Sequence, residues 1–238
     1  MTFKFRRYDS RFQAGEILAK LINQQNPVLY NQIKEKSKNF FCFAIPNGGM
    51  PVAEGFCSKF KINFDMLIVR KIKIPWNTEA GFGSVTTDGT VLTNDPLLKQ
   101  LALSEKEVNE AINLTKTEIK ERLKFYNKDI DLEGLFEKNI KDKHIFMIDD
   151  GLASGFTMLA AIKMVKKYNP KEISLAVPTA PLHTVQRIQA AVKIDEIFCP
   201  NIRTVMRFAV ADAYLHWYDV PESEVLDIIS ESKFYIKS

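Results

Sequence analysis

The sequence has 238 residues, of which 46% are hydrophobic and 26% are charged. This composition is ordinary for a globular protein and excludes a disordered chain, a collagen-like repeat and a coiled-coil rod. The net charge of +4 and the pI near 8.8 are too small an excess to indicate nucleic-acid binding.

Apolar runs such as residues 40–45 are far shorter than the roughly 18 residues that a bilayer-spanning helix needs, so we expect no membrane partner. The opening residues, MTFKFRRYDS, lack the apolar segment of a secretory signal. The three widely spaced cysteines fit a reducing cytoplasm, and we expect a cytoplasmic protein. The three histidines show no metal-ligand spacing, which argues against structural zinc.

Apolar spacing in chain order predicts a helix from Ser10 and a strand over 40–45 that ends in PNGG. A helix over 51–60 and a second buried strand over 64–69 follow. Residues 75–95 contain several glycines and hydroxyl side chains, and we expect short strands joined by a turn at Asp88-Gly89.

A capping box formed by Ser104 and Glu107 predicts a long helix over 104–126, which is either solvated or a dimer contact. Strands are then expected over 144–148, 173–177 and 194–199, with helices after the first two. Strands that alternate with helices indicate an α/β fold with a mostly parallel, doubly wound sheet. We expect a single domain over 1–238, with a core over about 38–200 and a small C-terminal hood over about 201–238.

The most informative motif is IFMIDDGLASGFT over residues 145–157. A buried strand ends in two adjacent carboxylates, Asp149 and Asp150, and a loop of small and hydroxyl residues then opens a helix. Free backbone N–H groups at such a helix start can cradle a phosphate. The neighbouring carboxylates make sense if they face sugar hydroxyls or a cation, so the pattern predicts a phosphorylated sugar with Mg²⁺.

This motif closely resembles the phosphoribosyl pyrophosphate (PRPP) signature of type I phosphoribosyltransferases. PNGGMP over 46–51 looks like the pyrophosphate loop of that family, and VRK over 69–71 looks like the basic end of the next strand. Residues 208–218, FAVADAYLHWY, are similar to the C-terminal part of a subgroup of predicted phosphoribosyltransferases.

The resemblance implies a role for each matching position. Asp149 and Asp150 would hold the ribose hydroxyls, directly or through Mg²⁺, and Lys71 would join them as a catalytic residue. The 5′-phosphate site would consist of Ala153, Ser154, Gly155, Phe156 and Thr157. The pyrophosphate site would consist of Asn47, Gly48, Gly49, Arg70 and Lys71, often with a non-proline cis peptide in the loop. The stretch 81–94 would be the flexible loop that closes over the reaction centre.

Two positions depart from the family pattern. Asn47 stands where the pyrophosphate loop usually carries Arg or Lys, which removes a charge at the leaving group. Ala153 stands where the hypoxanthine-guanine enzymes carry a carboxylate, which disfavours a 6-oxopurine substrate. Trp217 is a candidate for stacking on the base, with burial in the core as the alternative.

The sequence therefore supports a Mg²⁺-dependent transferase that joins ribose 5-phosphate to a nitrogenous base in nucleotide salvage or synthesis. We expect it to be a homodimer. The alternative is a regulatory protein that binds PRPP or a nucleotide with little chemistry. A third hypothesis, nucleic-acid binding, has no motif to support it.

Overall fold

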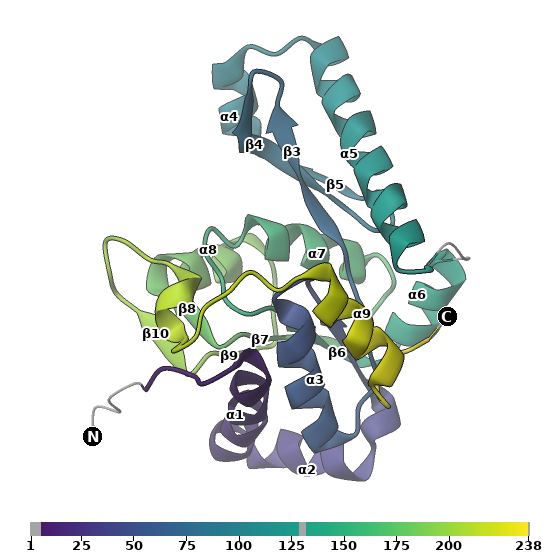
Figure 1. The fold of residues 1–238 in the computed structure, drawn as a ribbon, viewed down its shortest axis with the longest axis vertical. Coiled ribbons are helices and arrows are strands. Elements are labelled where there is room, and N and C mark those ends of the chain that lie inside the picture. The colour runs from purple at the N-terminus through teal and green to yellow at the C-terminus, as the bar shows by residue number, and fades with distance from the viewer. Residues whose placement is uncertain (1–5, 129–131, 238) are drawn as a thin grey trace.

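A computed structural model of the chain describes residues 6–128 and 132–237. It consists of an α/β body and an arm that projects from the body (Figure 1). The body holds a five-stranded parallel sheet, and the arm holds a three-stranded antiparallel sheet beside a long helix. The predicted α/β fold with a mostly parallel sheet is confirmed.

The main sheet has the strand order β2-β1-β6-β7-β9, with every neighbouring pair parallel. Its strands are β1 (Phe40–Ala44), β2 (Phe64–Met66), β6 (His144–Ile148), β7 (Glu172–Ala176) and β9 (Glu196–Phe198). Ala44, the last residue of β1, lies opposite Ile148, the last residue of β6. The loops that follow these two strands therefore start side by side at one edge of the sheet.

Helices cover both faces of this sheet, because alternate side chains of each buried strand point to opposite faces. Phe40 and Cys42 of β1 join one apolar core, whereas Phe41 and Phe43 join the other. The first core is covered by α1 (Arg11–Gln25), α2 (Pro27–Glu35), α3 (Gly49–Phe60) and α9 (Glu222–Glu231). The second is covered by α6 (Leu132–Ile140), α7 (Phe156–Lys166) and α8 (Leu182–Ala191).

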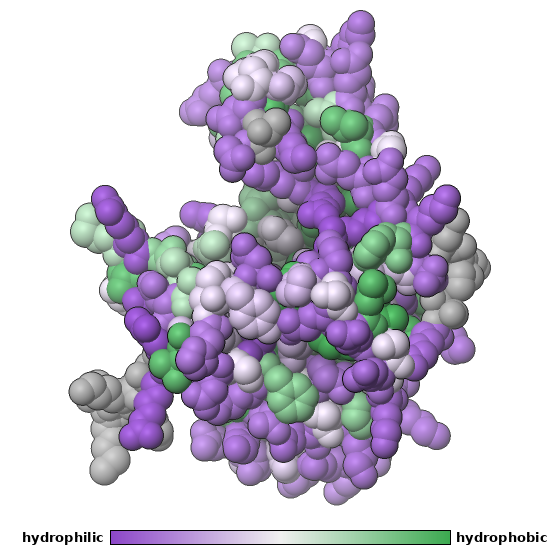
Figure 2. Space-filling view, viewed as in Figure 1, coloured by the Kyte–Doolittle hydropathy of each residue, from purple (hydrophilic) through white to green (hydrophobic). Residues whose placement is uncertain are grey.

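The arm consists of β3 (Val69–Ile74), β4 (Asn77–Thr86), β5 (Val91–Thr93), α4 (Asp95–Leu101) and α5 (Glu105–Phe125). The predicted turn at Asp88-Gly89 is present, and Gly89 adopts a φ of 81°, which favours glycine. The predicted capping box of Ser104 and Glu107 opens α5. The face viewed in Figure 2 is mainly hydrophilic and is hollowed where the arm meets the body.

The second predicted strand is shorter than expected. β2 ends at Met66, and Val69 already begins β3 in the arm. In β3 the buried Ile72 and Ile74 alternate with exposed lysines, which is the pattern of a strand with one covered face. The strand packs against α5, so Arg70 and Lys71 lie on the arm and not at the end of a main-sheet strand.

The segment over residues 81–94, which the resemblance identified with the flexible loop, forms parts of β4 and β5 and the turn between them. Lys167 of the body forms a 3.0 Å ion pair with Asp88 at this turn, and Lys163 Nζ donates to the carbonyl of Val91 at 3.2 Å. This segment is therefore a strand pair anchored on α7. A closing movement of the segment remains a prediction.

The C-terminal region over residues 201–237 contains β10 (Asn201–Arg203), a short 3₁₀ helix (Val210–Ala213) and α9. β10 pairs in parallel with β8 (Thr179–Pro181) beside the main sheet, and a second 3₁₀ turn (Ser37–Asn39) precedes β1. A buried ion pair of 2.5 Å between Lys128 and Asp65 ties the base of the arm to β2. Within residues 6–128 and 132–237, no helix is both long and apolar enough to cross a membrane.

His144 at the start of β6 is buried, as expected for a structural histidine. It contacts Ser174 Oγ at 2.8 Å and Glu172 Oε2 at 2.9 Å, and it stacks on Phe146. Burial lowers the pKa of this imidazole, and the nearby carboxylates of Glu172 and Asp195 only partly oppose the effect. The folded protein therefore holds His144 in its neutral form.

We predict that this histidine makes the fold less stable in acid. Below about pH 6.5 the unfolded chain binds a proton at His144 before the folded chain does, so the free energy of unfolding falls until the pH passes the lowered folded pKa. Urea unfolding at about pH 8 and about pH 5 should show a smaller acid loss for His144→Gln than for the unchanged protein. An equal loss in both proteins would contradict this prediction.

Candidate active site

Two loops meet at the carboxyl edge of the main sheet, residues 45–49 after β1 and residues 149–155 after β6. They touch at Gly48, because a Cβ at that position would overlap the carboxylate of Asp150. Only glycine leaves room for the carboxylate there, so the two motifs that were recognised separately in the sequence form one site.

The loop over residues 153–157 presents free amides. The N–H groups of Ala153, Ser154, Gly155 and Thr157 donate to no acceptor within the described part of the chain. Ala153 and Ser154 are exposed, whereas Gly155 is buried against α8 and has a φ of 73° where α7 begins. Free N–H groups at a helix N-terminus are the arrangement that a phosphate requires.

Helix α8 hydrogen-bonds to two carbonyls of this loop. The Thr184 hydroxyl donates to the carbonyl of Ala153 at 2.6 Å, and Arg187 Nη1 donates to the carbonyl of Ser154 at 3.1 Å. Because these contacts hold the carbonyls toward α8, the peptide N–H groups are left for a ligand. Neither residue was identified from the sequence, since nothing in the sequence of α8 indicates contact with a loop about thirty residues away.

The paired carboxylates have one strong partner. Arg11 Nε of α1 donates to Asp150 Oδ2 at 2.8 Å, and the two side chains are only 3% and 15% exposed. Asp149 Oδ1 accepts the backbone N–H of Asp150 at 2.8 Å. One oxygen of each carboxylate is therefore occupied by these contacts, and the two carboxyl groups also interact with each other.

The two carboxyl groups differ in their electrostatics. Burial and the adjacent Asp150 raise the pKa of Asp149 well above its usual value. Burial also raises the pKa of Asp150, but the Arg11 guanidinium opposes that rise. Arg11 thus stabilises negative charge on Asp150, whereas no described cation pairs with Asp149 in the same way.

Aromatic rings surround the Arg11 guanidinium. Its central carbon lies 4.2 Å from the ring centroid of Trp217, with Tyr214 and Tyr218 slightly farther away. The hydroxyl of Tyr214 also donates to the carbonyl of Asp150 at 2.7 Å. Trp217 is 41% exposed and is therefore not a core tryptophan. It belongs to a cluster that fixes Arg11, and thereby Asp150, from the C-terminal region.

The loop after β1 has a cis peptide bond between Pro46 and Asn47. Gly49 is the first residue of α3, and its N–H donates to the carbonyl of Ile45 at 2.9 Å. The N–H groups of Asn47 and Gly48 donate to no acceptor among residues 6–128 and 132–237. The side chain of Asn47 is held by Val220 and by Arg122 of α5.

The structure does not bring Lys71 to this loop. Its Nζ donates to the carbonyl of Glu79 on the arm, and its side chain is exposed against Gly81. Arg70 is half-buried and lines a hollow of about 400 Å³ together with Arg122 and Glu222. Burial, followed by repulsion from Arg122, lowers the pKa of Arg70.

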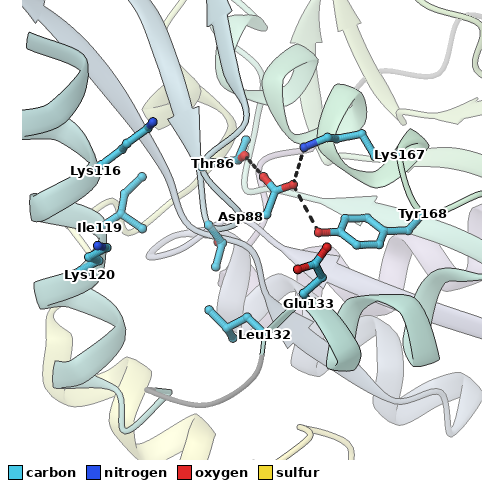
Figure 3. Close-up of a pocket in the computed structure, with 11 residues that line it drawn as sticks. Thr86, Asp88, Lys116, Ile119, Lys120, Leu132, Glu133, Lys167 and Tyr168 are labelled. Carbon is cyan, nitrogen blue, oxygen red and sulfur yellow. Dashed lines mark hydrogen bonds and ion pairs between the residues drawn. The ribbon is translucent and has the colours of Figure 1, made fainter. Parts of the chain in front are cut away.

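A separate hollow of about 440 Å³ lies between the arm, α6 and the end of α7 (Figure 3). Asp88 is bonded to Thr86, Lys167 and Tyr168 on one wall, and Lys116 and Lys120 extend from α5 on the other. None of the residues predicted for the site lines it. It adjoins the carboxyl end of α7, whereas the phosphate loop adjoins the amino end.

The described residues contain no cluster of three or more His, Cys, Asp or Glu side chains that could hold a metal ion. Asp149 and Asp150 are the predicted ligands and supply two carboxylates. Mg²⁺ prefers oxygen donors and commonly takes only one or two carboxylates, with water and substrate phosphates completing its shell. The two adjacent carboxylates are enough for a cation of this kind.

The parallel sheet therefore carries, at its carboxyl edge, a loop of free amides beside paired acids and a second, glycine-containing loop. The family model for the phosphoribosyl transferase domain matches residues 13–213, and the chain belongs to this family.

Among curated relatives, the chain is 25% identical over 225 residues to a Mycobacterium tuberculosis protein named "Putative phosphoribosyl transferase". The match covers 94% of this chain and 47% of the relative, so the chain spans about half the length of that protein. A uracil phosphoribosyltransferase of Ureaplasma urealyticum is 37% identical over 62 residues, which are 25% of this chain and 30% of that one.

The TT1426 protein of Thermus thermophilus has a similar structure, with a TM-score of 0.72 and 22% identity. The match covers 95% of this chain and 99% of that one, and it supports the fold.

We predict that loss of Arg11 destabilises the protein. Breaking a buried ion pair leaves one charge without a partner, so Arg11→Met should lower the free energy of unfolding by about 3 kcal/mol in urea. The exposed Arg7 is the matched control, and Arg7→Met should change the free energy of unfolding by less than about 0.5 kcal/mol. Adding Asp150→Asn to Arg11→Met should recover part of the loss. A double variant no more stable than the Arg11 single variant would argue against a direct pair.

Proposed function

We propose that this chain transfers the ribose 5-phosphate group of PRPP to a nitrogenous base and releases pyrophosphate. The observation that carries the proposal is the set of four free backbone N–H groups within residues 153–157, directly beside Asp149 and Asp150. A phosphate monoester fits the amides, and a sugar diol fits the carboxylates, so one sugar phosphate satisfies both. The family match supports the same interpretation.

In this proposal the amides of Ala153 to Thr157 and the hydroxyls of Ser154 and Thr157 bind the 5′-phosphate. The positive end of α7 favours the phosphate charge. Asp149 and Asp150 accept hydrogen bonds from the ribose hydroxyls. Arg11 holds Asp150 in place while this happens.

The second anion loop binds the leaving group. The free N–H groups of Asn47 and Gly48 donate to pyrophosphate, and Gly49 begins the helix that supports them. Arg70 and Lys71 are also proposed to bind pyrophosphate. Lys71 Nζ would first have to break its hydrogen bond to the carbonyl of Glu79. Fixed donors aimed at a developing anion favour its departure without reorganisation.

The proposed reaction is a displacement at the anomeric carbon of the ribose. The bond from this carbon to the pyrophosphate oxygen breaks, a bond to a ring nitrogen of the base forms, and the proton of that nitrogen passes to water or to the departing pyrophosphate. The main contribution of the protein is to hold the two reactants in line. Mg²⁺, held by Asp149 and Asp150, would neutralise charge on pyrophosphate.

Base recognition would fall to the C-terminal region around Trp217. One part of the indole packs on Arg11, and the exposed remainder is the part proposed to stack on a base. Residues 1–238 would act as one domain, because α1 near the start and α9 near the end both pack on α3. A homodimer, a cytoplasmic location and a role in nucleotide salvage or synthesis belong to the same proposal.

Two features favour the alternative of a regulatory protein that binds PRPP with little chemistry. Arg11 already occupies an oxygen of Asp150, and Asn47 brings no charge to the pyrophosphate loop. A protein with these features could bind PRPP and transfer its ribosyl group slowly. Calorimetric titration with PRPP and Mg²⁺, followed by pyrophosphate release with a panel of purine and pyrimidine bases, separates the two functions. Tight binding without release for any base would select the regulatory function.

We predict that Thr157→Val weakens the binding of PRPP and of ribose 5-phosphate about tenfold, because a hydrogen bond to a charged group contributes about 1.5 kcal/mol. Thr117→Val on the exposed side of α5 is the matched control and should leave both affinities unchanged. Calorimetry in the presence of Mg²⁺ measures both ligands. If Thr157→Val combined with Asp149→Asn still bound PRPP like the unchanged protein, the site assignment would be wrong.

A further inference from the structure

The pyrophosphate loop carries no charged side chain of its own, but Asn47 connects it to a cation on the arm. Its side-chain oxygen accepts a hydrogen bond from Arg122 Nη2 of α5. Its side-chain nitrogen donates to the carbonyl of Val220 at 2.8 Å. The amide is thus oriented from both sides, with its oxygen toward the arginine. Because Asn47 has a short side chain, the guanidinium lies close to the free N–H groups of the loop.

Arg122 is fixed in this position by groups other than Asn47. Its Nη2 forms a 2.6 Å ion pair with Glu222 of α9 and also bonds to the hydroxyl of Tyr126 at 3.2 Å. Tyr126 in turn donates to Glu222. The arginine side chain is 18% exposed. A guanidinium held in this way does not have to be ordered when a ligand arrives, which removes part of the entropic cost of binding.

The same contacts leave two nitrogens of the guanidinium unused. All of its hydrogen bonds to described residues run through Nη2, whereas Nη1 and Nε donate to none of them. Both two-donor edges of a guanidinium include Nη2, so the unused N–H groups donate singly to a phosphate oxygen. Glu222 offsets part of the charge, so a ligand meets single charged donors with a partly compensated charge.

Arg70 adds a second cation at the same place. Arg70 and Arg122 line one hollow, and Arg70 forms no ion pair with a described residue. Two neighbouring guanidinium groups repel each other, and an anion between them removes that repulsion. Three carboxylates also line the hollow, Glu118, Glu121 and Glu222. Lys73 pairs with Glu118, and Arg122 pairs with Glu222. The exposed Glu121 forms no ion pair within the described residues.

We propose that Arg122, reaching from α5, supplies the positive charge at the pyrophosphate loop that Asn47 lacks, with Arg70 beside it. An unused N–H group of its Nη1 or Nε donates to the diphosphate group of the ligand, next to the N–H groups of Asn47 and Gly48. This inference rests on the proposed function, because it assumes that the loop receives a diphosphate. It also gives the arm a role in the site: the arm carries the cation for the leaving group.

The test compares two ligands that occupy different parts of the site. Calorimetric titrations of the full chain use pyrophosphate with Mg²⁺ and, separately, ribose 5-phosphate. Arg122→Gln should weaken pyrophosphate binding by about tenfold, because it removes a charge-assisted hydrogen bond, and should leave ribose 5-phosphate binding within about twofold. The matched control is Lys124→Gln, which removes the same charge from an exposed position of α5 and should change neither affinity.

A rescue distinguishes a charge effect from a packing effect. Asn47→Lys, introduced into the Arg122→Gln protein, places a cation on the loop itself and should restore most of the lost pyrophosphate affinity. Pyrophosphate binding that is unchanged in Arg122→Gln, or ribose 5-phosphate binding that falls equally, would overturn the inference. So would a rescue variant that binds no better than Arg122→Gln.

A measurement on the unchanged protein covers the case in which Arg122→Gln does not fold. Pyrophosphate should protect Arg122 from an arginine-specific dicarbonyl reagent, as mapped by mass spectrometry of peptides, and ribose 5-phosphate should not. Equal labelling with and without pyrophosphate would overturn the inference.

The two proposals fail in different ways. If the unchanged protein binds pyrophosphate through Arg122 but binds neither PRPP nor ribose 5-phosphate, the proposed transferase function fails and the anion site stands. If it binds PRPP but Arg122 makes no difference to pyrophosphate, only the assignment of Arg122 fails. If it binds none of these ligands, both are wrong.

Discussion

Two adjacent carboxylates at the end of a buried strand are the constraint on which the rest of the site depends. Asp149 and Asp150 are half-buried, and a carboxylate that loses part of its water without gaining a partner is costly. The fold compensates one of them by bringing Arg11 from α1 to within 2.8 Å of Asp150. The pKa of the other, Asp149, stays well above its usual value. Asp150 therefore has an ion-pair partner, and Asp149 has none among the described residues.

Several distant segments serve this arrangement. Gly48 leaves the space that the carboxylate of Asp150 fills, and Tyr214 bonds to the backbone of the same aspartate. Trp217 and two tyrosines enclose the guanidinium of Arg11. The N-terminal helix, the loop after β1 and the C-terminal region therefore all converge on one ion pair. A change in any of these segments is expected to act on the site through Asp150.

The second anion loop depends on the arm in a similar way. Asn47 is short and carries no charge, yet it bonds to Arg122 of α5 and to Val220 of the C-terminal region. The base of the arm is tied to the main sheet by the buried pair of Lys128 and Asp65, and its turn at Asp88 is tied to α7. These contacts set where the guanidinium stands relative to the loop. The position of the arm and the charge offered at the loop are therefore linked.

Local sequence determined the elements and the two loops. Continuous apolar runs over residues 40–45 and 144–148 each form a strand covered on both faces, and the loops after them are the predicted anion loops. The capping box at Ser104 and the turn at Asp88-Gly89 were also predictable, because both depend on residues only a few positions apart. The bounds of β2 and β3 were not, since the run over 64–69 does not show where the chain leaves the main sheet.

Tertiary structure alone decided which cations lie beside the two loops. Arg11 lies 139 positions from Asp150 and Arg122 lies 75 positions from Asn47, and neither stands in a recognisable motif. Lys71, which the resemblance gave as a site residue, donates to a carbonyl on the arm, and its role in the site remains a prediction. A short motif fixes the backbone that is proposed to bind a phosphate, because that geometry arises within a few residues. A long charged side chain can reach the same point from many places in a chain, so only the packing of α1 and α5 shows which one does.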